Sequence, residues 1–227
     1  MNRRARIALL VTAVLAAAAL VPLAARQVPF FRVRRIELVG VRYLDPQRVV
    51  TALGLAPEQN LFDPLGEARA GLEAVAGVVS VELDRRPPGT LRVTVVERLP
   101  AAFVSGETGM IALDCAGRPL PYDPAASGLD LPLVPRADSA LVRTLCMVRA
   151  ADSALYQQVE LARDAGTGEG AVTLELGQQR VLIPSLPTTE EITAVGAVRR
   201  HLAAARRDAT ELDARFAGWI VVRRERS

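Results

Sequence analysis

The sequence contains no lysine, one histidine and two cysteines, and aromatic residues make up only 4% of its 227 residues. All 28 basic residues are therefore arginine, and they are spread among 25 acidic residues without an accompanying stripe of aromatic residues. This distribution excludes a dedicated nucleic-acid-binding surface as an interpretation. Because aromatic residues are scarce while half of the residues are hydrophobic, we expect a core built from Val, Leu, Ile and Ala.

The patterns that accompany catalysis and cofactor binding are also missing from the sequence. There is no Gly-x-Ser-x-Gly motif, no glycine-rich phosphate loop and no His/Cys cluster with the spacing of metal ligands. The single histidine, His201, follows two arginines in a helix-like segment, where a solvated side chain is the common case. Glu190 and Glu191 lie where a helix begins, and the helix dipole explains them without chemistry. We expect no enzyme activity, no cofactor, no metal and no small-molecule substrate.

The two cysteines, Cys115 and Cys146, leave two interpretations open. They form a disulfide if the domain that carries them lies in an oxidising compartment. Otherwise both are small hydrophobic residues of the core.

The longest uncharged segment, residues 7–25, lies close to the N-terminus and follows three arginines. As a helix it covers about 28 Å, close to the roughly 30 Å of a bilayer's hydrocarbon core. We expect a cytoplasmic tail at 1–6, a transmembrane helix at 7–25 and a linker at 26–30, with the rest of the chain outside, since a short arginine-rich tail stays inside. A signal peptide cleaved within residues 16–19 is the alternative, although its apolar region is usually shorter.

The first outer domain is expected at residues 31–104. Residues 45–54 and 63–77 each start with Asp-Pro and end in Gly, which predicts two consecutive helices because Asp is a good N-cap and Pro fits the first helical position. A strand-like run precedes these helices and two alternating apolar runs follow them. The predicted order is strand, helix, helix, strand, strand.

The second outer domain is expected at residues 105–223, followed by a tail at 224–227. Short alternating segments predict a β-rich domain with helices packed on a mostly antiparallel sheet, so the fold class is α+β. Thr188 and Glu191 predict a capping box. The expected elements are a strand at 110–113, a short apolar strand within 129–134, a helix at 139–148, a helix and then a strand from about residue 158 within 150–165, a hairpin at 172–183, and a helix at 188–207.

The chain ends with two strand-like segments, residues 212–216 and 219–222, and the second begins with the only tryptophan, Trp219. One interpretation is that Trp219 fills the core. The other is that it lies on an edge strand, whose unpaired backbone groups accept a strand from another chain. Aromatic and arginine residues dominate the binding energy of interfaces.

Three phrases of the first domain resemble the FtsQ/DivIB family of bacterial cell-division proteins: FFRVRRIELVGVRYLDPQRVVTALGL, NLF and VVSVELDRRPPGTLRVTVVERLPAAFV. The strand–helix–helix–strand–strand order just outside a single membrane helix resembles a polypeptide-transport-associated (POTRA) domain. The segment from Leu212 to Phe216 is similar to the Asp-x-Arg-aromatic strand of this family.

The resemblance implies a single-pass inner-membrane scaffold at the division septum, with its C-terminal domains in the periplasm. Its partners would be FtsB- and FtsL-like coiled-coil division proteins, and it would help to recruit and regulate septal peptidoglycan synthesis. The partner-binding residues that the resemblance implies lie at the last strand: Arg215, Phe216, Gly218, Trp219, Ile220 and Val221. Arg215 would face an acidic residue of the partner.

Two other functions remain as alternatives. A POTRA-containing transport or secretion component would bind extended chains by β-augmentation, although such proteins usually carry several POTRA units. A secreted, released binding module is the third interpretation.

Overall fold

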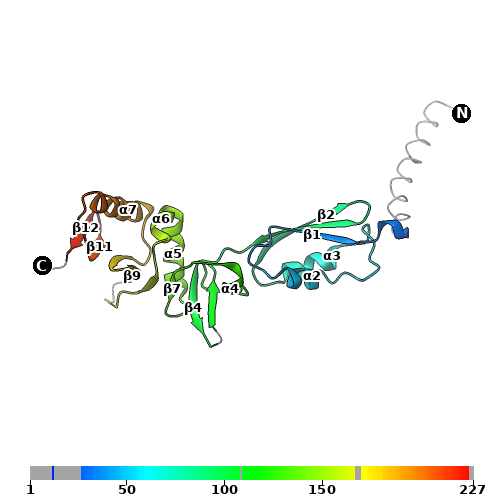
Figure 1. The fold of residues 1–227 in the computed structure, drawn as a ribbon, viewed down its shortest axis with the longest axis horizontal. Coiled ribbons are helices and arrows are strands. Elements are labelled where there is room, and N and C mark those ends of the chain that lie inside the picture. The colour runs from blue at the N-terminus through cyan, green and yellow to red at the C-terminus, as the bar shows by residue number, and fades with distance from the viewer. Residues whose placement is uncertain (1–11, 13–26, 108, 167–169, 225–227) are drawn as a thin grey trace, which may run out of the picture. The chain divides into compact units, whose positions relative to one another are not determined.

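The computed structural model describes residue 12 and residues 27–107, 109–166 and 170–224 (Figure 1). The predicted transmembrane helix at 7–25 lies outside these described residues, apart from Thr12. Across the described part of the chain, no helix is both long enough and apolar enough to span a membrane. The chain divides into two compact units, residues 1–97 and 98–227.

The first unit has the predicted order of elements after one short 3-10 helix. They are η1 (Pro29–Phe31), β1 (Arg35–Val39), α2 (Pro46–Leu53), α3 (Gly66–Glu73), β2 (Val78–Arg86) and β3 (Thr90–Glu97). The sheet order is β1-β3-β2, with β1 parallel to β3 and β2 antiparallel to it. One sheet face buries the alternating residues Leu91, Val93 and Val95, and the two helices contribute Val49 and Leu72 to the same core.

The first predicted helix is confirmed in detail. Asp45 caps α2 by accepting a hydrogen bond from the amide of Gln47, Pro46 is its first residue, and Gly54 ends it in the left-handed conformation.

The second Asp-Pro pair was interpreted wrongly. Helix α3 begins at Gly66, and the side chain of Asp63 accepts a hydrogen bond at 2.8 Å from the amide of Asn60. The carboxylate therefore closes the preceding turn and is not available as the N-cap. The helix also ends at Glu73, before the glycine at position 77 that was expected to end it.

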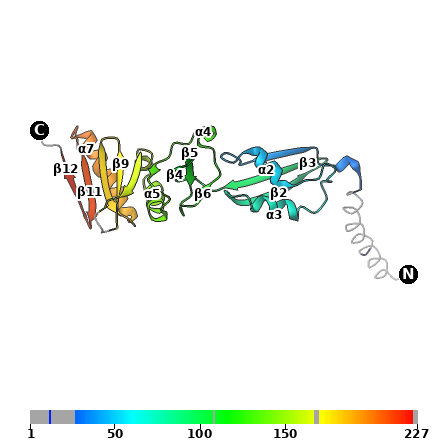
Figure 2. The same ribbon diagram turned by 90° about the horizontal axis from the view of Figure 1, so that it is seen from below.

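The second unit holds one nine-stranded sheet and its helices (Figures 1 and 2). Its strands are β4 (Ala102–Gly106), β5 (Gly109–Leu113), β6 (Pro119–Leu120), β7 (Leu133–Val134), β8 (Leu161–Asp164), β9 (Ala171–Leu176), β10 (Gln179–Pro184), β11 (Glu211–Phe216) and β12 (Trp219–Arg223). Its helices are α4 (Pro124–Ser127), α5 (Ser139–Ala151), α6 (Ser153–Tyr156) and α7 (Thr189–Ala204). The sheet order is β12-β11-β10-β9-β8-β7-β4-β5-β6, and most neighbouring pairs are antiparallel.

Helices α5 and α7 pack through buried aliphatic side chains into the same core as the central strands. The predicted capping box at Thr188 and Glu191 is confirmed. The strand expected from about residue 158 begins instead at Leu161, because a turn in which the amide of Val159 donates to the carbonyl of Tyr156 follows α6 first.

Cys115 and Cys146 form a disulfide, which joins the turn after β5 to α5. The sequence left two interpretations open, and the structure agrees with the disulfide.

Candidate functional site

The candidate site is the last strand of the second unit, β12, which lies at one end of the nine-stranded sheet (Figure 2). Among the described strands only β11 pairs with it. Phe216 lies opposite Trp219, and the two residues between them make the hairpin turn. Gly218 in this turn has φ of +77°, a conformation that costs little for glycine and much for most other residues.

The expected site residues split between the two faces of this hairpin. Trp219 is 77% exposed, Phe216 52% and Val221 43%. Ile220 is only partly exposed and packs against the core of the unit. The interpretation that Trp219 fills the core is therefore wrong, since its side chain lies on the solvent face of the sheet edge.

Arg215 is held within its own chain. Its guanidinium donates to both carboxylate oxygens of Asp213, at 2.9 and 2.7 Å, and its side chain is 20% exposed. The Asp213 side chain is only 1% exposed. Hydrogen bonds from the Arg215 side chain hold the pKa of the Asp213 carboxyl below its ordinary value, against the opposing effect of burial. The geometry thus gives Arg215 a carboxylate partner before any other protein binds.

Sequence reasoning missed Asp213, although a signal for it was present. In a strand, residues two positions apart lie on the same face, so an Asp-x-Arg sequence places a carboxylate beside a guanidinium. The pairing also coincides with a β-bulge, since the register of β11 against β12 shifts between Asp213 and Phe216. The observed register places Trp219 and Val221 on the exposed side of the hairpin.

The register also fixes which backbone groups of β12 point away from the sheet. The amide of Arg180 in β10 donates to the carbonyl of Thr210, so by alternation Glu211 and Asp213 direct their backbone groups toward β12. Their partners, Arg223 and Val221, direct theirs toward β11. The N–H and C=O groups of the alternate residues, Ile220 and Val222, therefore point to the open edge, where a further strand would pair.

The described residues do not bring together three or more His, Cys, Asp or Glu side chains that could hold a metal ion. What the geometry of this edge offers is a row of backbone hydrogen-bonding groups flanked by exposed aromatic and aliphatic side chains. This combination suits the addition of a strand from another protein.

Comparison with known proteins gives one domain match and similarity to two named relatives. Residues 31–98 match the family described as POTRA domain, FtsQ-type. The chain is 32% identical over 120 residues to the cell division protein FtsQ of Corynebacterium glutamicum, covering 52% of this chain and 53% of that protein. It is 28% identical over 167 residues to the cell division protein FtsQ of Mycobacterium leprae, covering 68% of this chain and 46% of that protein.

The chain thus spans about half the length of these two relatives. The domain match covers the first unit, and both relatives carry the same name, which agrees with the motifs quoted from the first domain. The first unit thus matches an FtsQ-type POTRA domain over residues 31–98, and the chain is similar to two cell division proteins named FtsQ.

Proposed function

We propose that this protein acts in cell division as a single-pass membrane scaffold, and that β12 is the edge on which it docks other division proteins. The docked partners are FtsB- and FtsL-like coiled-coil proteins, and docking helps to recruit and regulate septal peptidoglycan synthesis. The protein itself performs no catalysis. The observation that carries this proposal is the sheet edge, where outward backbone groups at Ile220 and Val222 lie beside the exposed Trp219.

The exposed side chains support docking by their energetics. Burying the apolar surface of a large aromatic side chain stabilises a complex by about 25 cal/mol for each Å² removed from water. Tryptophan is also enriched among the residues that contribute most of the binding energy of interfaces. Trp219 and Phe216 are mostly exposed in the free protein, so a partner gains this burial only when it binds. The main-chain hydrogen bonds of an added strand then fix its register.

The structure changes the role proposed for Arg215. Because its guanidinium is bonded to Asp213, we propose that Arg215 holds the bulge that presents Phe216 and Trp219. Recruiting Arg215 to a partner's acidic residue would leave the buried Asp213 carboxylate without its main donor, which is costly.

The test is a pull-down from membranes that compares the wild type with Trp219→Asp. We expect the variant to lose its coiled-coil division partners while its circular dichroism spectrum is unchanged. The matched control is Met110→Asp, since Met110 is 38% exposed in β5, which lies near the opposite end of the same sheet from β12. Equal partner recovery with Trp219→Asp and wild type would contradict docking at β12.

The membrane anchor has its own test. Fractionation of cells should recover the intact chain with the membranes, and its release should require detergent. Recovery of the full-length chain in the soluble extract would contradict the anchor while leaving the docking edge untouched.

A further inference from the structure

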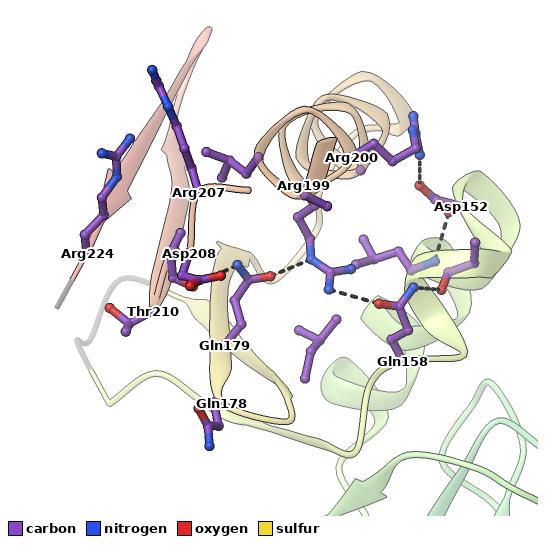
Figure 3. Close-up of a pocket in the computed structure, with 17 residues that line it drawn as sticks. Asp152, Gln158, Gln178, Gln179, Arg199, Arg200, Arg207, Asp208, Thr210 and Arg224 are labelled. Carbon is purple, nitrogen blue, oxygen red and sulfur yellow. Dashed lines mark hydrogen bonds and ion pairs between the residues drawn. The ribbon is translucent and has the colours of Figure 1, made fainter. Parts of the chain in front are cut away.

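A second feature of the C-terminal unit is a polar pocket of about 850 Å³ between α6, the β9–β10 turn, α7 and the segment after β12 (Figure 3). Four arginines line this pocket, against two aspartates, which gives it a net charge of +2. The arginines are Arg199, Arg200, Arg207 and Arg224, and the aspartates are Asp152 and Asp208.

Arg199 is the inner cation of this pocket and is half-buried. Its guanidinium donates to two neutral amide oxygens, that of Gln179 at 2.6 Å and that of Gln158 at 3.0 Å. No carboxylate of the described residues makes an ion pair with it. Burial lowers the pKa of Arg199, with the charge of Asp152 acting in the opposite direction.

The two glutamines are themselves held in place. The amide nitrogen of Gln179 donates to the carbonyl of Ala209, and that of Gln158 donates to the carbonyl of Ala154. Their oxygens are thereby fixed toward Arg199, as Figure 3 shows. Neutral acceptors position a guanidinium without cancelling its charge, and two hydrogen bonds leave part of its five N–H donors for a ligand.

The other three arginines of the pocket differ in whether a carboxylate neutralises their charge. Arg200 is paired with Asp152, whose other oxygen caps α6 by accepting from the amide of Leu155. Arg207 and Arg224 are exposed and form no ion pair with any described residue. The pocket therefore has an inner guanidinium held by amides and two outer ones that face solvent.

We propose that this pocket binds an oxyanion, a phosphate or carboxylate group, with Arg199 as its inner ligand and Arg207 and Arg224 as its outer ligands. Guanidinium groups suit both anions because their N–H donors match two oxygens at once. The pocket volume exceeds what a single anion needs, and Leu155, Leu176 and Leu202 add apolar surface, so the anion is carried by a larger molecule. The proposal does not depend on strand addition at β12.

Two sources share this chemistry, and two probes distinguish them. Pyrophosphate represents a free phosphorylated molecule, and hexaglutamate, compared with hexaglutamine, represents the side chains of an acidic polypeptide. Binding is measured by isothermal titration calorimetry of the full chain in neutral-detergent micelles at low ionic strength, because exposed charges are screened by salt.

The substitution Arg199→Gln is expected to weaken binding of the anion about tenfold, the usual scale for a charge-assisted hydrogen bond in a partly buried site. Arg207→Gln and Arg224→Gln should each weaken it roughly two- to fivefold, since these side chains are exposed. Arg143→Gln is the matched control, because Arg143 is an exposed arginine of α5 in the same unit that does not line the pocket. Trp219→Asp should bind the anion as the wild type does.

Saturable binding of pyrophosphate with this order of effects supports the site and a free ligand. The same order with hexaglutamate and not with pyrophosphate supports the site and an acidic polypeptide. The proposal is overturned if neither probe binds, or if Arg143→Gln weakens binding as much as Arg207→Gln does. If Arg199→Gln fails to fold, the comparison of Arg207→Gln and Arg224→Gln with Arg143→Gln decides the question.

Discussion

The guanidinium of Arg215 donates hydrogen bonds to both carboxylate oxygens of Asp213, at 2.9 and 2.7 Å, next to a β-bulge. The backbone amide of Arg215 also donates to Asp213, at 3.2 Å. This pair lies directly before Phe216, so it fixes the point at which β11 turns into the exposed hairpin. The proposed docking edge therefore depends on a buried ion pair within the same chain.

Replacing Asp213 by asparagine should destabilise the second unit at neutral pH by about 3 kcal/mol, because it breaks a buried ion pair by removing one partner. The folded-state pKa of Asp213 lies below the ordinary value of 3.8. Its contribution is therefore present above that value and is lost as the pH falls through the lower folded pKa. The measurement is urea unfolding followed by far-UV circular dichroism.

The difference in unfolding free energy between wild type and Asp213→Asn isolates this residue from the other carboxylates. We expect that difference to shrink as the pH falls below 3.8. A difference that stays constant down to the acid limit of folding would contradict the assigned role of the pair.

Replacing Val222 by proline should lower the recovery of division partners about tenfold. Proline lacks the backbone N–H that points to the open edge at this position, and the loss of such a hydrogen bond costs about 1.5 kcal/mol of binding free energy. The measurement is the membrane pull-down described above. Val222→Ala is the control, because it trims the same partly buried side chain but keeps the N–H. Equal recovery of partners with both variants would argue against backbone pairing at this edge.

Reducing the disulfide between Cys115 and Cys146 should destabilise the second unit by about 3–4 kcal/mol, the value expected for a loop closed over a separation of 31 residues. Urea unfolding with and without a reductant measures this effect. The double variant Cys115→Ser with Cys146→Ser should match the reduced wild type and should not respond to reductant. If free thiols are detected after reduction but the unfolding free energy of the wild type does not change, the disulfide does not stabilise the second unit.

Replacing Gly40 by alanine should destabilise the first unit by more than 2 kcal/mol. Its φ of +82° is unfavourable for alanine, and the added Cβ would collide with the carbonyl oxygen of Val95. Gly54→Ala is the matched control, since φ is +58° there and the Cβ would meet no atom within 4 Å, so only the conformational cost of about 1 kcal/mol applies. Equal destabilisation of the two variants, measured by thermal unfolding, would show that contact with Val95 does not matter.

Several features followed from the sequence because they depend on neighbours along the chain. Asp45, Pro46 and Gly54 specify the two ends of α2 by local capping, and Thr188 with Glu191 specifies the start of α7 in the same way. Short motifs of the first domain were enough to predict the FtsQ-type POTRA domain that residues 31–98 match.

Other features did not follow from the local sequence motif alone. Asp63 has the same local signal as Asp45, yet the amide of Asn60 takes its carboxylate, because the turn before α3 offers a donor that competes with the helix. The exposure of Trp219 depends on β11 pairing in parallel with β10, which leaves β12 at the end of the sheet.

The polar pocket likewise combines a feature that the sequence predicts with contacts that only the fold brings about. The sequence determined that Arg199 lies on a helix, but Gln158 and Gln179 reach it from segments 41 and 20 residues away. Local residue patterns determine where helices and strands begin and end, because their hydrogen bonds join near neighbours. Only the tertiary structure decides which carboxylate meets which guanidinium and which strand stays at the edge, because those contacts depend on the whole fold.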